Sequence, residues 1–254
     1  MTRSRTIIAA TAVIVAIAVG GFVVYDQVLR GDSAAALALP TPSTASSAPT
    51  ASAVAGASGA PAASAVVSAS SAGDVAGTWN VAANSVAGYR VREQLANLPA
   101  ESDAVGRTDK VTGSITIEGS GDTTSLTAGT LSVDTTSISS DKSMRDNRLR
   151  NEGLQTDSFP TATFTLTAPV AVPAAALAGT ASDVTLTGDL TLHGVTKSVS
   201  IPAKAQLVNG VISVAGSLGF PLSDYSITAP NIGGFIVSIA DTGTLEFLVN
   251  FTKA

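Results

Sequence analysis

The chain has 254 residues, of which 45% are hydrophobic and 13% charged, with a formal net charge of -5 and no cysteine. Such an acidic, sparsely charged chain is a poor candidate for nucleic-acid binding, because neutralising phosphates requires clustered Lys and Arg. The absence of cysteine excludes disulfides, thiolate nucleophiles, cysteine-based metal sites and a lipid-modified cysteine anchor.

An apolar run near the N-terminus predicts export. Residues 7–25 contain Thr11 as their one clearly polar residue, and nineteen such residues are about the length that crosses a hydrocarbon core of about 30 Å. Arg3 and Arg5 precede the run, so the positive-inside rule sends the rest of the chain across the membrane. We predict a cytoplasmic N-terminus and single-pass anchor in the cell membrane over residues 1–32. The alternative is a signal sequence whose cleavage releases a secreted protein.

The next segment has the composition of a linker. Residues 33–72 carry no charge and consist of Ala, Ser, Thr, Pro and Gly with a few Val and Leu. Because they offer few large side chains to bury, they cannot offset the entropy lost on ordering. We predict a disordered linker over these residues, followed by one folded domain at 73–254, which is long enough to bury a sizeable core.

Alternating apolar and polar residues predict β-strands along most of this domain, since successive side chains of a strand point to opposite faces. The clearest patterns lie at 111–118, 161–167, 184–192, 212–218 and 244–252, and weaker ones at 78–81, 88–92, 126–133, 195–203 and 235–240. His193 and Gly194 separate two strands, as a tight hairpin turn would. Ten short strands predict an all-β barrel or sandwich.

One helix is expected between the strands. Ser139, Ser140 or Asp141 can cap a helix that ends near Glu152, and Gly153 suits the position just past its end. Its few apolar residues place it on the surface or over one end of a barrel.

The apolar faces of the strands mix large residues with Gly113, Gly188, Gly216 and Ala162. Small residues on an inner face allow either closer strand packing or a cavity, and a small barrel is filled by its own side chains or holds one ligand. The filled barrel is the default interpretation, but alternation alone cannot distinguish it from a hollow one.

A set of motifs then follows in a characteristic order. These are GTWNV at 77–81, VDTTSI at 133–138, RDNRLR at 145–150, FPTATF at 159–164, GDLTLHGVTK at 188–197 and DYSI at 224–227. In this order and spacing they resemble the YceI-like, polyisoprenoid-binding family over nearly all of residues 77–252. The resemblance implies a lipocalin-like antiparallel β-barrel with one short helix, export from the cytoplasm, and an apolar pore that takes a long isoprenoid. Arg148 stands where the family usually has His, so no role that needs an imidazole carries over.

Large apolar residues on the predicted inner faces are the candidate pore lining. They are Phe164, Leu190, Leu192, Phe220, Phe235, Phe247 and Phe251. The alternative for each is ordinary core. A lipid chain gains about 25 cal/mol per Å² of apolar surface removed from water, so such a lining can hold an isoprenoid without specific polar contacts.

The densest basic cluster comprises Lys142, Arg145, Arg148 and Arg150. Arg145 and Arg148 are three apart and share a helix face, where they could contact an anionic head group such as a pyrophosphate. The favoured alternative is structural: a solvated helix end whose arginines pair with neighbouring acidic residues.

Nothing in the sequence indicates a catalytic centre, a metal site or a cofactor. His193 is the only histidine, and one histidine builds no zinc site without a cysteine or carboxylate set. We expect it to serve packing or the hairpin, Trp79 to plug the core, and Asp134 and Asp141 to act in turns and caps.

The sequence therefore predicts a non-enzymatic, extracytoplasmic protein that binds an isoprenoid or another amphiphilic lipid. The alternative is a filled barrel that serves as a structural or interaction module of the cell envelope. The oligomeric state, including a homodimer, is left open.

Overall fold

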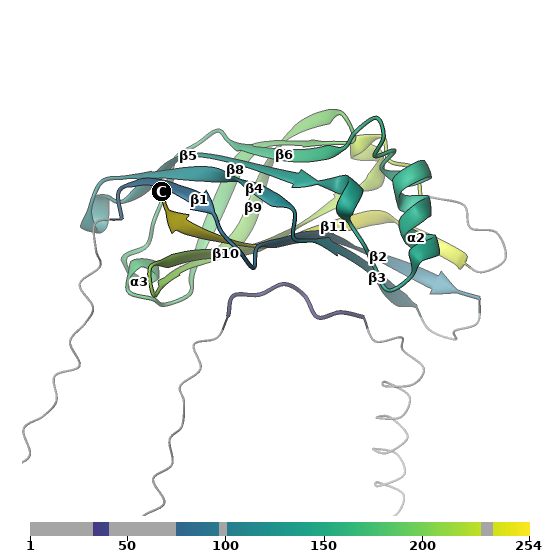
Figure 1. Cartoon of the computed structure of the whole chain (residues 1–254), viewed down its shortest axis with the longest axis horizontal. Coiled ribbons are helices and arrows are strands. Elements are labelled where there is room, and N and C mark those ends of the chain that lie inside the picture. Colours follow the sequence, from purple (N-terminus) through teal and green to yellow (C-terminus); the bar gives the residue numbers. More distant parts are fainter. Residues whose placement is uncertain (1–32, 41–74, 97–100, 230–235) are drawn as a thin grey trace, which may run out of the picture.

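The computed structural model describes residues 33–40, 75–96, 101–229 and 236–254 (Figure 1). The strands are β1 (Gly77–Val81), β2 (Val86–Leu95), β3 (Ser102–Thr108), β4 (Val111–Glu118), β5 (Ser125–Asp134), β6 (Thr161–Leu166), β7 (Val170–Ala171), β8 (Ser182–Leu192), β9 (Val195–Val208), β10 (Val211–Pro221) and β11 (Ile236–Lys253). Every pairing between them is antiparallel.

Within the described residues, eight strands close a circuit in the order β1-β4-β5-β6-β8-β9-β10-β11, because β1 pairs with both β4 and β11. β11 also pairs along its N-terminal part with β2, so β2 and β3 lengthen the wall at one end. The predicted all-β, lipocalin-like antiparallel barrel is confirmed. The two strands predicted at 235–240 and 244–252 form a single strand, β11. A register shift between Ile239 and Gly243 interrupts its alternation.

The predicted helix is shorter than expected. α2 covers Ser143–Arg148 and continues as one π-helical turn, η4 (Leu149–Gly153). None of the predicted caps is used, because Lys142 occupies the N-cap position and Asp141 pairs with Arg145 instead. A second helix, α3 (Ala174–Leu177), and the 3-10 turns η2 (Gly121–Thr123), η3 (Thr135–Ser137) and η5 (Leu222–Tyr225) were not expected.

The turn between β8 and β9 is the predicted tight hairpin. His193 and Gly194 have φ values of 50° and 74°. Positive φ at both central residues is the signature of a type I′ turn, whose twist matches that of the flanking strands.

Two glycines on the inner face of the barrel make room for the rings of neighbouring phenylalanines. A Cβ on Gly188 would lie 2.5 Å from the Phe164 ring, and one on Gly216 would lie 2.8 Å from the Phe247 ring. Gly216 and Phe247 are direct cross-strand partners. Both rings therefore lie against the barrel wall, and replacing Gly188 by a large residue would also drive its Cβ to 2.3 Å from the Thr165 carbonyl oxygen.

The two ends of the barrel differ. The end that carries α3 and the C-terminus is filled by a cluster that includes Trp79, Ile117 and Phe251, so we call it the closed end. Trp79 is buried there as predicted, and its indole N–H donates to the Val75 carbonyl oxygen at 2.9 Å. α2 lies at the opposite end, which we call the mouth end (Figure 1).

The predicted disordered linker is corrected at its start. Residues 33–40, which we call the strap, lie extended against the outside of the barrel and are hydrogen-bonded to it (Figure 1, dark purple). Residues 41–72 lie outside the described residues, as does the predicted anchor at 7–25. No helix within the described ranges is long and apolar enough to cross a membrane.

Candidate functional site

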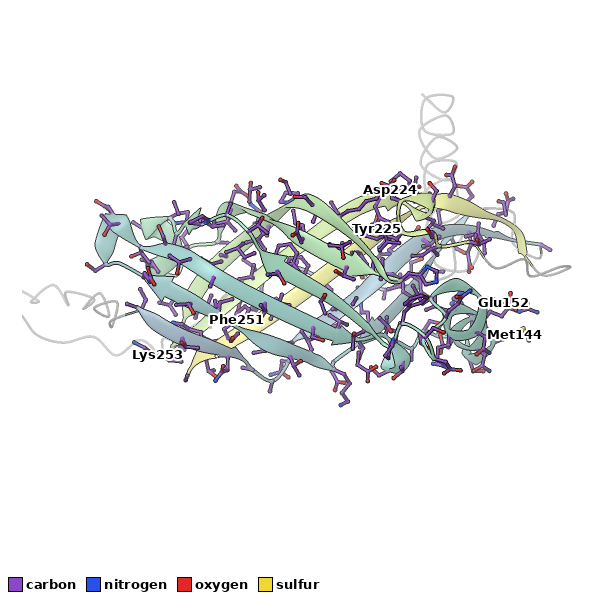
Figure 2. The ribbon with its side chains drawn as sticks, turned by 90° about the horizontal axis from the view of Figure 1, so that it is seen from above. Met144, Glu152, Asp224, Tyr225, Phe251 and Lys253 are labelled. Atoms are coloured by element: carbon purple, nitrogen blue, oxygen red, sulfur yellow. The ribbon has the colours of Figure 1, made fainter. Side chains whose placement is uncertain are left out.

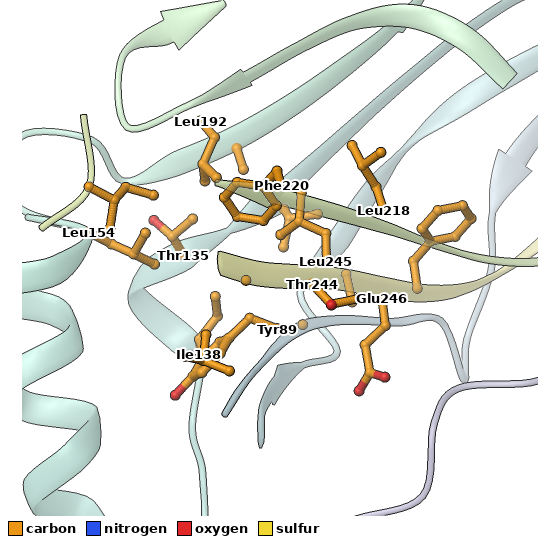
Figure 3. Close-up of a pocket in the computed structure, with 18 of the residues that line it drawn as sticks. Tyr89, Thr135, Ile138, Leu154, Leu192, Leu218, Phe220, Thr244, Leu245 and Glu246 are labelled. Atoms are coloured by element: carbon orange, nitrogen blue, oxygen red, sulfur yellow. The ribbon is translucent and has the colours of Figure 1, made fainter. Parts of the chain in front are cut away.

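A cavity of about 200 Å³ runs from the mouth end into the barrel, and its wall is almost entirely apolar (Figure 3). β2, β5, β6, β8, β10 and β11 supply most of the wall, and the segment around α2 and η4 supplies Ile138, Leu149 and Leu154. Figure 3 shows Leu192, Phe220 and Leu245 close together in this wall. The cavity therefore offers an apolar compartment with few polar partners for a ligand.

Five of the seven candidate lining residues lie in this wall: Phe164, Leu190, Leu192, Phe220 and Phe247. Phe251 does not, because it packs with Trp79 in the closed end and is 2% exposed. Phe235 lies outside the described residues. Alternation places Phe251 on the inner face correctly, but it does not tell which height along the barrel is filled.

The rim of the cavity carries a buried ion pair that sequence reasoning missed. Arg145 on α2 binds the carboxylate of Glu93 on β2 and that of Asp141, and Glu93 is 3% exposed. Burial disfavours the charged form of Arg145, but the hydrogen bonds and charges of Glu93 and Asp141 outweigh it and raise its pKa. The Nε of Arg145 is buried without a hydrogen-bond partner among the described residues.

Tyr89 lies beside this ion pair in the cavity wall. Its burial raises its pKa to about 12, with smaller contributions from the neighbouring charges. The phenol is therefore neutral over the whole physiological pH range.

The two predicted head-group residues separate in the structure. Arg145 reaches the cavity wall, whereas Arg148 is not part of it and pairs with Glu152 at 3.2 Å. Arg150 donates to the Ile138 carbonyl oxygen at 3.3 Å and to Asn147 Oδ1 at 3.0 Å, and Lys142 lies 3.8 Å from Asp141. Most of the basic cluster is thus committed to structural contacts.

His193 packs as predicted. Its Nδ1 lies 3.0 Å from the Tyr225 carbonyl oxygen, which can only accept, so Nδ1 carries the proton. The ring meets Phe159 edge to face at 4.6 Å between centroids. No group of three or more His, Cys, Asp or Glu suited to a metal occurs within the described ranges.

The predicted cap role of Asp134 is found, whereas Asp141 has a different one. Asp134 is the N-cap of η3, and its carboxylate accepts from the Thr136 backbone N–H at 2.9 Å and from the Thr136 hydroxyl at 2.6 Å. These hydrogen bonds lower the pKa of Asp134, and the one from the Thr136 side chain has the largest effect.

Glu246 in β11 is a wall residue whose charge points outward. Figure 3 shows its carboxylate directed away from Phe220 and Leu245. It is 4% exposed and accepts from Arg107 at 2.7 Å and from Arg90 at 3.5 Å. The lumen is thus kept apolar although a charged residue stands in its wall.

Comparison with known proteins finds several similar solved structures. A polyisoprenoid-binding domain from Saccharophagus degradans is 22% identical with a TM-score of 0.53, over 69% of this chain and 98% of that one. BcnA of Burkholderia cenocepacia is 18% identical with a TM-score of 0.49, over 65% and 95%. A YceI protein of Campylobacter jejuni is 18% identical with a TM-score of 0.47, over 59% and 85%.

No curated protein gives a significant match. The profile of the YceI-like domain, however, matches residues 79–251. This range spans the barrel from β1 to β11, including the cavity and α2, and the resemblance seen in the sequence motifs is confirmed. The chain therefore belongs to the YceI-like family.

Proposed function

We propose that the protein binds a long apolar lipid of the polyisoprenoid class outside the cytoplasm, and that it holds or transfers this lipid without catalysing a reaction. The observation that carries the proposal is the apolar cavity that reaches the mouth end. Family membership supports it, as does the fold shared with a polyisoprenoid-binding domain. The apolar run at residues 7–25 serves in this proposal as the membrane anchor.

The size of the cavity sets how such a lipid is held. At about 200 Å³ it lies below the roughly 300–1,000 Å³ of typical small-molecule pockets. A long isoprenoid would therefore insert one end of its chain and leave the rest at the mouth, or widen the lumen by side-chain movement. Either mode relies on burial of apolar surface, which needs no fixed polar contact.

The experiment is native mass spectrometry of the full chain after extraction from its host membrane, followed by retention of a radiolabelled C20 prenol on gel filtration. We expect a co-purifying lipid, and one labelled prenol per chain. A chain that carries no lipid and retains no prenol above a denatured control would refute the proposal.

The filled half of the barrel favours a second candidate, an envelope module that binds no lipid. Trp79, Ile117 and Phe251 close one end with ordinary core packing. The same gel-filtration experiment separates the two candidates, because such a module retains no prenol at any chain length.

A further inference from the structure

The strap is fixed to the barrel at both of its ends and between them. The Ser33 hydroxyl donates to the Asp103 carbonyl oxygen at 3.2 Å and accepts from the Asp103 N–H at 3.1 Å. At the other end, the side-chain amide of Gln206 donates to the Pro40 carbonyl oxygen at 3.1 Å. Between them, Leu37 and Leu39 are half-buried while their neighbours are exposed. This alternation is that of an extended segment with one face on the barrel.

The first half of the strap covers the Glu246 ion pairs. Arg90 donates to the Ala34 carbonyl oxygen at 2.7 Å, and Arg107 donates to that of Ala35. Both guanidinium groups also bind Glu246, and Arg90 binds Asp103 as well. The same Nη2 group of each arginine also donates to Glu246, so the strap carbonyls and the Glu246 carboxylate share the donors of these partly buried guanidinium groups. The docking is specific to this surface.

The strap has a definite direction along the barrel. Ser33 binds Asp103, whose strand partner is Arg92, one residue from the rim residue Glu93. Pro40 binds Gln206, whose partner Ser213 hydrogen-bonds to Asn250. The Asn250 side-chain amide in turn donates to the Asn84 carbonyl oxygen in the turn between β1 and β2, which lies beside the closed-end residue Phe251 of β11. The strap therefore enters at the mouth end and runs toward the closed end.

Docking shortens the connection to the apolar run. Seven residues, 26–32, lie between that run and Ser33, and they span at most about 25 Å. If the strap were free, the 49 residues of 26–74 would join the run to the barrel, with a root-mean-square span of roughly 35–42 Å and a far larger maximum. A docked strap therefore keeps the mouth end near the membrane.

The surface at the mouth end suits a bilayer. Met144 on α2 is 61% exposed and is the one large hydrophobic side chain that is exposed in the described part of the chain. Figure 2 shows it projecting from the end of the barrel opposite Lys253. The neighbouring Lys142 and Arg148 pair with Asp141 and Glu152, so contact with the bilayer rests on the exposed apolar side chain of Met144.

We propose that docking of residues 33–40 orients the barrel, so that its mouth end and Met144 face the bilayer that holds residues 7–25. The inference rests on the anchor in the proposed function, and it adds a reason for the strap to be ordered: a lipid could pass between bilayer and cavity without crossing water. The strap is then an orienting device, and the length of chain before it sets the distance.

The test uses the absence of native cysteine in the full chain, reconstituted in nanodiscs that contain acceptor-labelled phospholipid. A donor dye is placed on Met144→Cys at the mouth end or on Asp122→Cys in η2, beside the closed end. We expect energy transfer several-fold higher from position 144. Replacing residues 33–40 by Gly and Ser at equal length should abolish the difference, whereas the same replacement at 51–58 should leave it intact.

Three outcomes would overturn the inference in distinguishable ways. Equal transfer from both positions in the native chain refutes the orientation. A difference that survives replacement of the strap refutes the role of the strap, provided that thermal unfolding shows the variant to be folded. A chain that does not stay with the nanodisc refutes the anchor. Prenol retention, measured on the same preparations, reports separately on the proposed function.

Discussion

Arg145 and Glu93 form an ion pair that fastens α2 to the rim of the barrel. Glu93 stands on β2 and is almost fully buried, so its charge is balanced by a residue more than fifty positions away in the sequence. Asp141 takes a second donor of the same guanidinium group. The pair therefore closes the wall between a strand and the helix at the cavity mouth.

Arg145→Ala should lower the free energy of unfolding by about 3–5 kcal/mol, because it leaves the buried Glu93 carboxylate unpaired. Arg148→Ala is the matched control on the same helix. It removes a largely exposed pair with Glu152 and should cost no more than about 1 kcal/mol. Urea unfolding of both variants measures the difference, and equal losses would contradict the role assigned to Glu93.

The same arrangement bears on the head group of the ligand. Because Arg145 is already engaged by Glu93 and Asp141, the mouth offers no uncompensated positive charge there. We expect a prenyl pyrophosphate to compete with labelled prenol at least about tenfold less well than the alcohol, since a charge moved from water without a partner loses more than about 1.4 kcal/mol. Stronger competition by the pyrophosphate, lost in Arg145→Ala, would support the head-group role predicted from the sequence.

Filling the cavity should block uptake without disturbing the fold. Ala162 lines the cavity, and Phe at this position would occupy the lumen. We expect Ala162→Phe to lower prenol retention at least about tenfold, because the added ring takes up the space that the ligand needs. The barrel should tolerate this overpacking and remain folded. Thr165→Phe, on the exposed face of the same strand, is the control. Full retention by a folded Ala162→Phe protein would argue against the cavity as the binding site.

Local patterns predict the wall of the barrel well and its interior less well. Alternation identifies the strands because one face of each is buried, and the His193–Gly194 turn follows from local geometry. The end of β2 beyond Arg92, the strand β3 and the Glu93–Arg145 pair depend on contacts between distant residues, which no local period reports. The strap is missed for a related reason. Its order comes from Arg90 and Arg107 on the barrel and not from its own composition.

Asp134 provides a prediction on pH. Its folded-state pKa lies below the ordinary value of 3.8, so the folded protein binds fewer protons than the unfolded chain in that range. The stability that this cap contributes is complete above the unfolded pKa and is lost as pH falls through the folded pKa. Asp134→Ala should cost about 0.5–2 kcal/mol at pH 7. The difference in unfolding free energy between Asp134→Ala and the native protein should decrease below about pH 3.8, the ordinary pKa of an aspartate. A gap in unfolding free energy that does not change with pH would contradict this.

Phe251 and Phe220 both lie on inner faces of the barrel, but Phe251 belongs to the core and Phe220 lines the cavity. Phe251 belongs to the closed-end cluster, so Phe251→Ala should cost about 3–5 kcal/mol of unfolding free energy and leave prenol retention within about twofold. Phe220 lines the cavity and meets Tyr225 edge to face at 5.3 Å between centroids. Phe220→Ala should widen the lumen and shift retention toward longer prenols. Thermal unfolding and a retention series from C10 to C40 measure both effects. If Phe251→Ala alters the chain-length preference as much as Phe220→Ala does, the closed end is part of the binding site and the lumen extends through the whole barrel.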